Sequence, residues 1–261
     1  MKKICVACGT EYPENNAPEV CVICAEERQY VPLSGQQWTR HAAMLRSHKT
    51  VIHKTDQFLY ELSIAPKFGI GQRAFLVISE KGNFLWDCIP LLNAETIDFI
   101  NSKGGLRGIG ISHPHYYSNM NSWADVFDCP IYIHEKDRDY VVYPSERIEF
   151  WKGKSKALWD DLSLINLGGH FDGGSVLMIQ NKTEKGVMLC SDILQIAPSR
   201  DFIALMYSYP NYIPLSSSEI KRISKELEKL SFDTLFGAFR YQHLDKNVRQ
   251  ILKKSIERHF E

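Results

Sequence analysis

The sequence predicts an α/β protein in which helices cover the outer faces of two β-sheets, an αββα sandwich, with a small cysteine-rich module ahead of it. Two Cys-x-x-Cys pairs lie close together near the amino terminus. From about residue 51 onward, short β-rich runs alternate with helical patterns, and such a chain buries its sheets under helices. We therefore expect a module at residues 1–35, a linker at 36–50 and a larger domain at 51–261.

The bulk composition excludes several classes of partner. The 261 residues are 44% hydrophobic and 24% charged, with a formal net charge of zero, which is typical of a globular protein with a sizeable core. A neutral chain without a long basic block gives no electrostatic reason to expect nucleic acid or an anionic membrane as a partner. No apolar run reaches the roughly 20 residues that span a bilayer. Seven cysteines, an odd number, favour metal binding in a reducing compartment, so we expect a cytoplasmic protein.

The amino-terminal module has the ligand spacing of a structural zinc site. Twelve residues with two prolines and two asparagines separate Cys5 and Cys8 from Cys21 and Cys24, so a turn-rich loop can bring the pairs together. Four thiolates with no open position form a tetrahedral cage for Zn²⁺, which would supply much of the folding free energy of so short a segment. The module resembles a zinc ribbon. Its first pair is also similar to the first knuckle of rubredoxin, so iron remains an alternative, as does a disulfide.

The elements of the larger domain follow from apolar periodicity and turn residues. Strands are expected at 57–64, 73–79, 84–88, 106–112, 130–134, 175–180, 186–190 and 234–239. Helices are expected at 94–103, 122–127, 218–230 and 247–259. A serine at 216, 217 or 218 caps the third of these helices.

Side chains that can bind a metal stand where several of these strands begin or end. His113 and His115 directly follow the strand at 106–112. His170 lies in a glycine-rich loop ahead of the strand at 175–180, and Asp192 follows the strand at 186–190. Three imidazoles and a carboxylate supply the nitrogen and oxygen ligands of a zinc or iron centre. The sequence therefore predicts a second metal site, separate from the cysteine cluster.

The order of these motifs resembles that of the metallo-β-lactamase superfamily. Residues 110–115 are similar to its His-x-His loop, residues 167–170 to its second histidine motif, and Asp192 to its strand-terminal aspartate. Asp87 is similar to the aspartate that supports the site in that family. The likeness spans roughly residues 51–240. It implies that the larger domain is a catalytic αββα domain and that the chain is a metal-dependent hydrolase, with glyoxalase II as the nearest analogy.

Two departures from the family pattern predict a single catalytic metal ion. The fuller motif is His-x-His-x-Asp-His, and Tyr117 and Ser118 occupy its last two positions here. The family's final histidine is missing from residues 237–239, and His243, the nearby substitute, has the wrong spacing. We therefore expect one Zn²⁺ or Fe²⁺ held by the three imidazoles. Asp192 would be its fourth ligand or would bind the water on the metal.

The chemistry expected of such a site is hydrolysis of a small molecule. A metal-bound hydroxide would attack an ester, thioester or lactone, and Asp192 would orient it. Tyr117, or its neighbour Tyr116, would donate a hydrogen bond to the developing oxyanion. Two alternatives stay open. One is a mononuclear iron oxygenase of the persulfide dioxygenase kind, and the other is a non-catalytic binding protein with a degenerate site.

Overall fold

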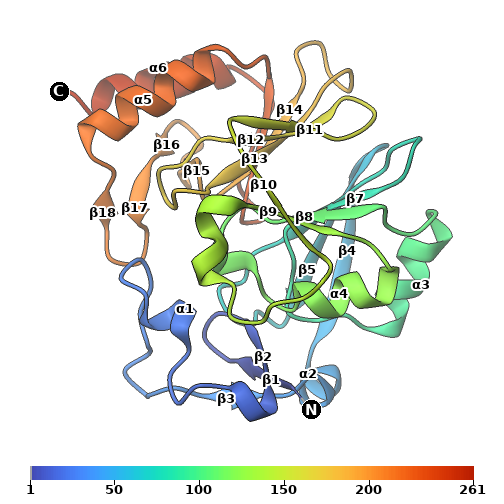
Figure 1. Cartoon of the computed structure of the whole chain (residues 1–261). Helices are drawn as coiled ribbons and strands as arrows, with labels where there is room; N and C mark the ends of the chain where they lie inside the picture. The colour runs from blue at the N-terminus through green and yellow to red at the C-terminus, as the bar shows by residue number, and fades with distance from the viewer. Residues whose placement is uncertain (1) are drawn as a thin grey trace.

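The computed structural model describes residues 2–261 and has two β-sheets stacked face to face between helices (Figure 1). In spatial order, the first sheet consists of β10 (Ile148–Trp151), β9 (Ile131–His134), β8 (Gly108–Gly110), β7 (Phe84–Trp86), β6 (Ala74–Val77), β5 (Leu59–Ala65) and β4 (Lys49–Asp56). The second consists of β11 (Ser155–Ala157), β12 (Leu162–Asn166), β13 (Ser175–Ile179), β14 (Val187–Ser191), β19 (Thr234–Gly237) and β20 (His243–Leu244).

The parallel pairs include the strands that precede His113, His115 and Asp192. In the first sheet, β7, β8, β9 and β10 run parallel, whereas β4 to β7 form antiparallel pairs. In the second sheet, β14 and β19 are parallel and the other pairs are antiparallel. Because the carboxyl ends of parallel strands meet at one edge of a sheet, loops after β7, β8 and β14 can reach a common site.

Helices cover the outer face of each sheet. The first sheet is covered by α3 (Ala94–Ser102) and α4 (Met120–Phe127), and the second by α5 (Ser217–Glu228) and α6 (Val248–Arg258) (Figure 1). Successive side chains of a strand face opposite layers. In β14, Leu189 packs between the sheets, and Met188 and Cys190 pack under α5 and α6. The predicted αββα fold is thereby confirmed.

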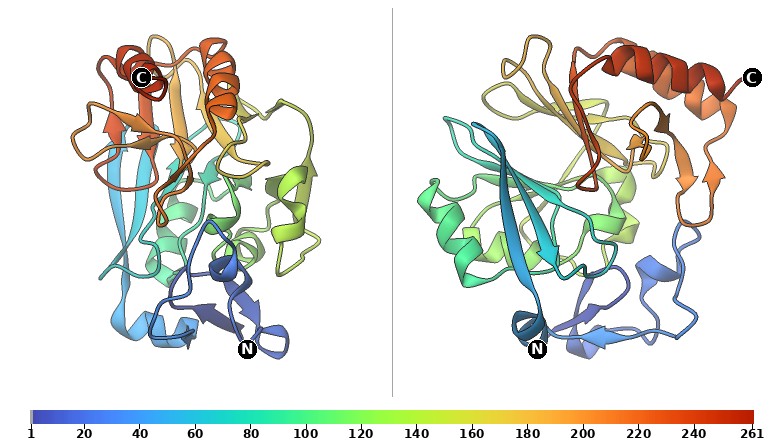
Figure 2. Two further views of the ribbon diagram at one scale, coloured as in Figure 1. Left: turned by 90° about the vertical axis from the view of Figure 1, so that its left-hand side faces the viewer. Right: turned by 180° about the vertical axis from the view of Figure 1, so that it is seen from behind.

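The cysteine module is a small sheet that lies against the sandwich. Its strands are β2 (Glu11–Pro13), β1 (Lys2–Cys5) and β3 (Trp38–Thr39), and α1 (Val22–Ala25) carries the second cysteine pair. The module contacts both halves of the sandwich, because Glu11 N donates to Ser118 O (2.9 Å) and Asn211 Nδ2 donates to Glu27 O (3.0 Å). Figure 2 shows the second contact, where the blue module meets the orange hairpin.

Smaller elements complete the description. They are α2 (His41–Ser47), η1 (Glu14–Asn16), η2 (Pro114–Tyr116), η3 (Glu135–Tyr140), β15 (Gln195–Ile196), β16 (Ile203–Ala204), β17 (Met206–Ser208) and β18 (Ile213–Pro214). Both β3 and α2 fall inside the predicted linker, and β3 pairs with β1 of the module. The domain boundaries themselves stay a prediction. Within residues 2–261, every helix is too short or too polar to cross a membrane.

Candidate metal centres

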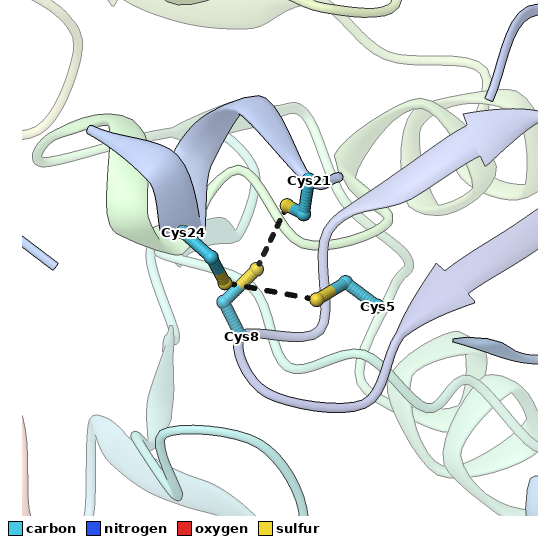
Figure 3. A group of neighbouring side chains, drawn as sticks. All are labelled: Cys5, Cys8, Cys21 and Cys24. Atoms are coloured by element: carbon cyan, nitrogen blue, oxygen red, sulfur yellow. Dashed lines mark hydrogen bonds between the residues drawn. The ribbon is translucent and has the colours of Figure 1, made fainter. Parts of the chain in front are cut away.

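The four cysteines of the module form a buried cluster of sulfur atoms (Figure 3). The Sγ atoms of Cys5 and Cys24 are 3.7 Å apart, and those of Cys8 and Cys21 are 3.6 Å apart. A tetrahedral Zn–S₄ site with bonds of about 2.3 Å has sulfur–sulfur edges of about 3.8 Å, whereas a disulfide needs about 2.05 Å. The geometry therefore fits a Cys₄ metal site and excludes disulfides within this cluster.

Polar neighbours complete the surroundings of these sulfur atoms. Gln36 Nε2 donates to Cys5 Sγ at 3.2 Å, and the Tyr12 hydroxyl lies 3.2 Å from Cys21 Sγ. Hydrogen bonds to the sulfur stabilise a metal-bound thiolate and fix its orientation. The module thus has both the ligands and the supporting donors of a structural metal site.

The second cluster joins residues from three loops of the sandwich. His113 follows β8 and precedes η2, and His115 lies within η2. His170 comes from the loop between β12 and β13, and Asp192 directly follows β14. The loop between β12 and β13 also contains Gly174. A Cβ at this position would lie 2.7 Å from Ile193 Cδ1 and 2.8 Å from a backbone oxygen, so only glycine permits this packing.

The predicted ligand atoms converge. His115 Nδ1 is 3.2 Å from His170 Nε2, and His113 Nε2 is 3.8 Å from Asp192 Oδ2. One ligand atom of each of the four residues lies within 4.8 Å of the others, and all four side chains are buried. The structure therefore brings together the three imidazoles and the carboxylate that the sequence predicted as metal ligands.

Hydrogen bonds orient the imidazoles for this role. His170 Nδ1 is 2.8 Å from the carbonyl oxygen of Tyr207, which can only accept, so Nδ1 carries the proton and the Nε2 lone pair faces the cluster. His113 Nδ1 is 2.8 Å from Ser112 Oγ, and its Nε2 has no hydrogen-bond partner among the described residues. In metal-bound histidines, the ring nitrogen that does not bind the metal is commonly held by a hydrogen bond, as Nδ1 is in both rings here.

Burial controls the charges of the cluster. It lowers the pKa of His113 and His115, and it lowers the pKa of His170 to about 3, so all three rings are neutral near pH 7. Burial also raises the pKa of Asp192 to about 6, although a hydrogen bond from Tyr116 opposes that rise. A neutral imidazole and an ionised carboxylate are the forms that bind a metal.

Asp87 supports the cluster from the end of β7. Its Oδ1 accepts the N–H of Ser112 at 2.8 Å, and its Oδ2 accepts a hydrogen bond from Ser191 Oγ. Trp86 Nε1 also donates to Ser191 Oγ, at 3.1 Å. Burial raises the pKa of Asp87 to about 7. The carboxyl thus links the loop before His113 to the strand before Asp192.

The two neighbouring tyrosines have different positions. The Tyr116 hydroxyl donates to Asp192 Oδ2 at 2.5 Å, whereas the Tyr117 hydroxyl donates to the carbonyl oxygen of Asp137 at 2.9 Å. We predicted Tyr117, or its neighbour Tyr116, as the catalytic donor. The Tyr117 hydroxyl is engaged away from the cluster, because Tyr117 follows the end of η2 and its side chain leaves the backbone in another direction than that of Tyr116. Tyr116 is the tyrosine at the site.

His243 does not join the cluster. It lies on β20, where its ring stacks on Phe236 with centroids 4.2 Å apart and planes inclined by 8°.

Arg28 was not predicted from the sequence as a residue near the site. Its guanidinium lies beside the ring of Phe171, which contacts the histidines. A lone arginine in a charged stretch after Cys24 gives no sequence signal of its own. A cavity of about 440 Å³ opens between the module and residues 67–70, but no residue of the histidine cluster lines it.

Sequence comparison identifies a close relative. No family model matches the chain. The uncharacterized protein YmaE of Bacillus subtilis (strain 168) is 40% identical over 259 residues, which cover 98% of this chain and 93% of the relative. This chain belongs to the YmaE family.

Solved structures similar to this YmaE family member are metallo-β-lactamases. DIM-1 exposed to ceftazidime has a TM-score of 0.59 and 13% identity, covering 81% of this chain and 98% of its own. TMB-1 has a TM-score of 0.59 and 14% identity, covering 81% and 99%. FIM-1 from Pseudomonas aeruginosa, in its mono-zinc form, has a TM-score of 0.56 and 11% identity, covering 80% and 93%. At these identities the likeness shows the metallo-β-lactamase fold, as the motif order implied.

Proposed function

We propose that this chain is a metal-dependent hydrolase that cleaves a small ester, thioester or lactone. The observation that carries the proposal is the convergence of His113, His115, His170 and Asp192 within 4.8 Å at the loop edge of a metallo-β-lactamase fold. Buried polar atoms without partners cost about 1–3 kcal/mol each. Three such atoms, His113 Nε2, His115 Nε2 and Asp192 Oδ1, belong to this cluster. A bound cation would satisfy those that face it.

The residues around the cluster can each take part in hydrolysis. A divalent ion held by this cluster would act as a Lewis acid on a carbonyl and would bring the pKa of water to about 7. Asp192 Oδ1 has no partner among residues 2–261 and offers a proton acceptor at the same point. The Tyr116 hydroxyl holds Oδ2 of the same carboxylate and fixes its orientation. Burial excludes bulk water and strengthens these interactions.

The positions of a second metal are filled by other contacts, which favours a single ion. Ser118 Oγ accepts a hydrogen bond from Gln72 Nε2 at 3.0 Å, and the Tyr117 hydroxyl is held by Asp137. Residues 237–239, where the family's final histidine is missing, are Gly, Ala and Phe, and none of their side chains has an atom that can bind a metal. FIM-1, which shares the fold, has been solved in a mono-zinc form. We therefore propose one Zn²⁺ or Fe²⁺ at the histidines, besides Zn²⁺ in the Cys₄ cluster.

Metal analysis combined with a substrate panel tests the proposal. Zinc-loaded protein should hydrolyse at least one of a p-nitrophenyl ester, an acyl thioester and a lactone. His113→Ala should lose one equivalent of metal and at least about 100-fold in kcat/KM. His53→Ala, a matched change at an exposed histidine on β4, should retain both. Fully loaded wild type that turns over none of the three substrates would overturn the hydrolase proposal.

A mononuclear iron oxygenase is the second candidate, because the same single-ion arrangement suits it. The metal found in protein purified without added metal distinguishes the two. Iron at the histidines, together with oxygen consumption on addition of a persulfide, would favour the oxygenase. Zinc with ester, thioester or lactone turnover favours the hydrolase.

A further inference from the structure

One segment of the cysteine module, residues 26–29, reaches across to the histidine cluster. Ser208 Oγ donates to the Arg28 carbonyl oxygen at 3.0 Å, and Asn211 Nδ2 donates to the Glu27 carbonyl oxygen at 3.0 Å. The Tyr207 hydroxyl bonds the Glu27 carboxylate, and the Tyr207 carbonyl oxygen holds His170. The segment is thus fixed to the hairpin of β17 and β18 that orients one of the predicted ligands (Figure 2).

The Arg28 side chain packs against an aromatic ring that also contacts the histidines. Its Cζ lies 4.5 Å from the ring centre of Phe171 and 4.3 Å from that of Tyr207. The Phe171 ring centre is in turn 4.9 Å from that of His115 and 5.2 Å from that of His170. The guanidinium and two of the predicted ligands therefore contact the same aromatic ring.

The guanidinium is incompletely paired. One of its terminal nitrogens bonds Glu26 Oε1, and it interacts with the Tyr140 hydroxyl, but its buried Nε has no partner. Among residues 2–261, ten buried side-chain atoms lack a partner, and four of them belong to Arg28 and the histidine cluster. A metal ion can satisfy the nitrogen and oxygen lone pairs of that cluster. It cannot satisfy an N–H donor of Arg28, which requires an acceptor.

We propose that Arg28 binds an anionic oxygen group, a carboxylate or a phosphate, carried by the substrate of the histidine site. The guanidinium fork matches such groups and binds them with charge-assisted hydrogen bonds. The inference rests on the proposed function, because it takes the histidine cluster as the place of reaction. It narrows the substrate to an anionic ester, thioester or lactone, and it makes the cysteine module the source of a specificity-determining residue.

Anion binding tests Arg28 without any turnover. Acetate and inorganic phosphate would be titrated calorimetrically into zinc-loaded wild type, Arg28→Met and Arg28→Lys. We expect the dissociation constant of at least one anion to rise about 10- to 100-fold in Arg28→Met, with a smaller rise in Arg28→Lys, which keeps the charge without the fork. Arg46→Met, at an exposed arginine of α2, should match wild type. Wild-type affinity for both anions in an Arg28→Met protein that retains its metals and Tm would overturn the inference.

A pair of esters then separates this inference from the hydrolase proposal. p-Nitrophenyl acetate is neutral, whereas mono-p-nitrophenyl succinate carries a carboxylate. If wild type hydrolyses them, Arg28→Met should lose about 10-fold or more in kcat/KM for the succinate ester and less than about threefold for the acetate ester. Equal losses for both would assign Arg28 a merely structural role and overturn the inference. If wild type hydrolyses neither, the hydrolase proposal is weakened, and the anion titration still decides the role of Arg28.

Discussion

Tyr116 places one hydroxyl against the carboxylate of Asp192, and replacing it with phenylalanine removes only that hydroxyl. The carboxylate then loses the donor that orients Oδ2 and favours its ionised form. Loss of such a supporting contact typically weakens metal binding by 10- to 100-fold. We expect Tyr116→Phe to show a fall of about that size in zinc affinity at the histidine site, measured by competition with a chelating dye.

Tyr117→Phe is the matched control, because it deletes the same group one residue along the chain. Its hydroxyl donates to the Asp137 carbonyl oxygen, away from the metal ligands. This variant should lose about 1 kcal/mol of unfolding free energy with zinc affinity unchanged. An equal loss of zinc affinity in both variants would contradict the role assigned to Tyr116.

Asp137 makes the stability of the protein depend on pH. Burial raises its pKa to about 7, although the N–H of Gly173, 2.7 Å away, opposes the rise. The folded pKa thus lies above the unfolded value of about 3.9. Below about pH 4 the carboxyl is protonated in both states and the free energy of unfolding is highest; it falls as pH rises through 7, where the buried carboxyl must ionise. Asp137→Asn does not ionise, so it should gain on the order of 2 kcal/mol relative to wild type between pH 5 and pH 8. Urea unfolding at several pH values checks this, and a constant difference would contradict it.

At the scale of single residues, the histidine cluster was predictable and the contacts that support it were not. His113, His115 and Asp192 could be predicted because each follows an apolar run, and His170 because it lies in a glycine-rich loop ahead of one. The structure brings the four side chains together. The choice between Tyr116 and Tyr117 depends on where a 3₁₀ turn points its side chains, and the sequence pattern does not contain that direction.

At the scale of the elements, β8 has no room for a side chain where it packs against the aromatic rings of β7. A Cβ on Gly110 would lie 2.7 Å from Phe84 Cζ and 3.1 Å from Trp86 Cε3. Gly110→Ala should therefore cost about 1–3 kcal/mol. It should also shift the fluorescence of Trp86, whose ring bonds Ser191 beside the site.

Gly108→Ala provides the comparison within the same strand. Its Cβ would approach Tyr132 at 3.0 Å and Trp159 at 3.3 Å, side chains that are only partly buried and can yield. We expect a smaller loss of stability, measured by the same chemical unfolding. Losses of equal size would show that the aromatic packing against Gly110 does not determine the effect.

The predicted elements were those with strong periodicity or clear caps. The helix expected at 218–230 is α5 (Ser217–Glu228), and Ser216 accepts the N–H of Glu219 as its cap. The strands β10, β11 and β12 had no prediction. β10 and β11 are short and half exposed, and the β10–β9 pairing joins segments that no hairpin signal connects. Long-range pairing of this kind is set by tertiary packing rather than by local pattern.

At the scale of the whole molecule, the cysteine module should control access to the histidine site, because residues 26–29 lie against the hairpin beside it. We expect Cys5→Ser to remove one equivalent of zinc and to unfold the module, because short segments with a Cys₄ cluster fold around their metal. The remaining zinc should then exchange with a chelator at least about 10-fold faster, since local unfolding exposes the site. Stopped-flow chelation with a zinc-sensitive dye measures this rate.

Cys129→Ser is the control for that experiment. Cys129 is a buried free thiol in the core under α4, outside the Cys₄ cluster. It should keep both equivalents of zinc and the wild-type exchange rate, despite some loss of stability. Unchanged exchange in Cys5→Ser would mean that the module does not shield the histidine site.

The overall fold followed from the order of the motifs, whereas the docking of the module did not. Apolar alternation predicted the two sheets, and the positions of the histidines and Asp192 implied the metallo-β-lactamase fold that the solved structures share. Docking depends on single polar contacts such as Glu11 N to Ser118 O. Contacts of this kind have no periodic signature in a sequence, so the position of Arg28 emerged only from the structure.

The contact between residues 26–29 and the hairpin of β17 and β18 has a consequence for biosynthesis. Chains leave the ribosome amino end first and fold as they emerge, so the Cys₄ cluster can take up its ion long before Asp192 has been translated. The hairpin that anchors residues 26–29 includes Asn211 and is made after all four ligands. There is thus an interval in which the side chains of the histidine cluster can gather a cation before residues 26–29 dock beside them.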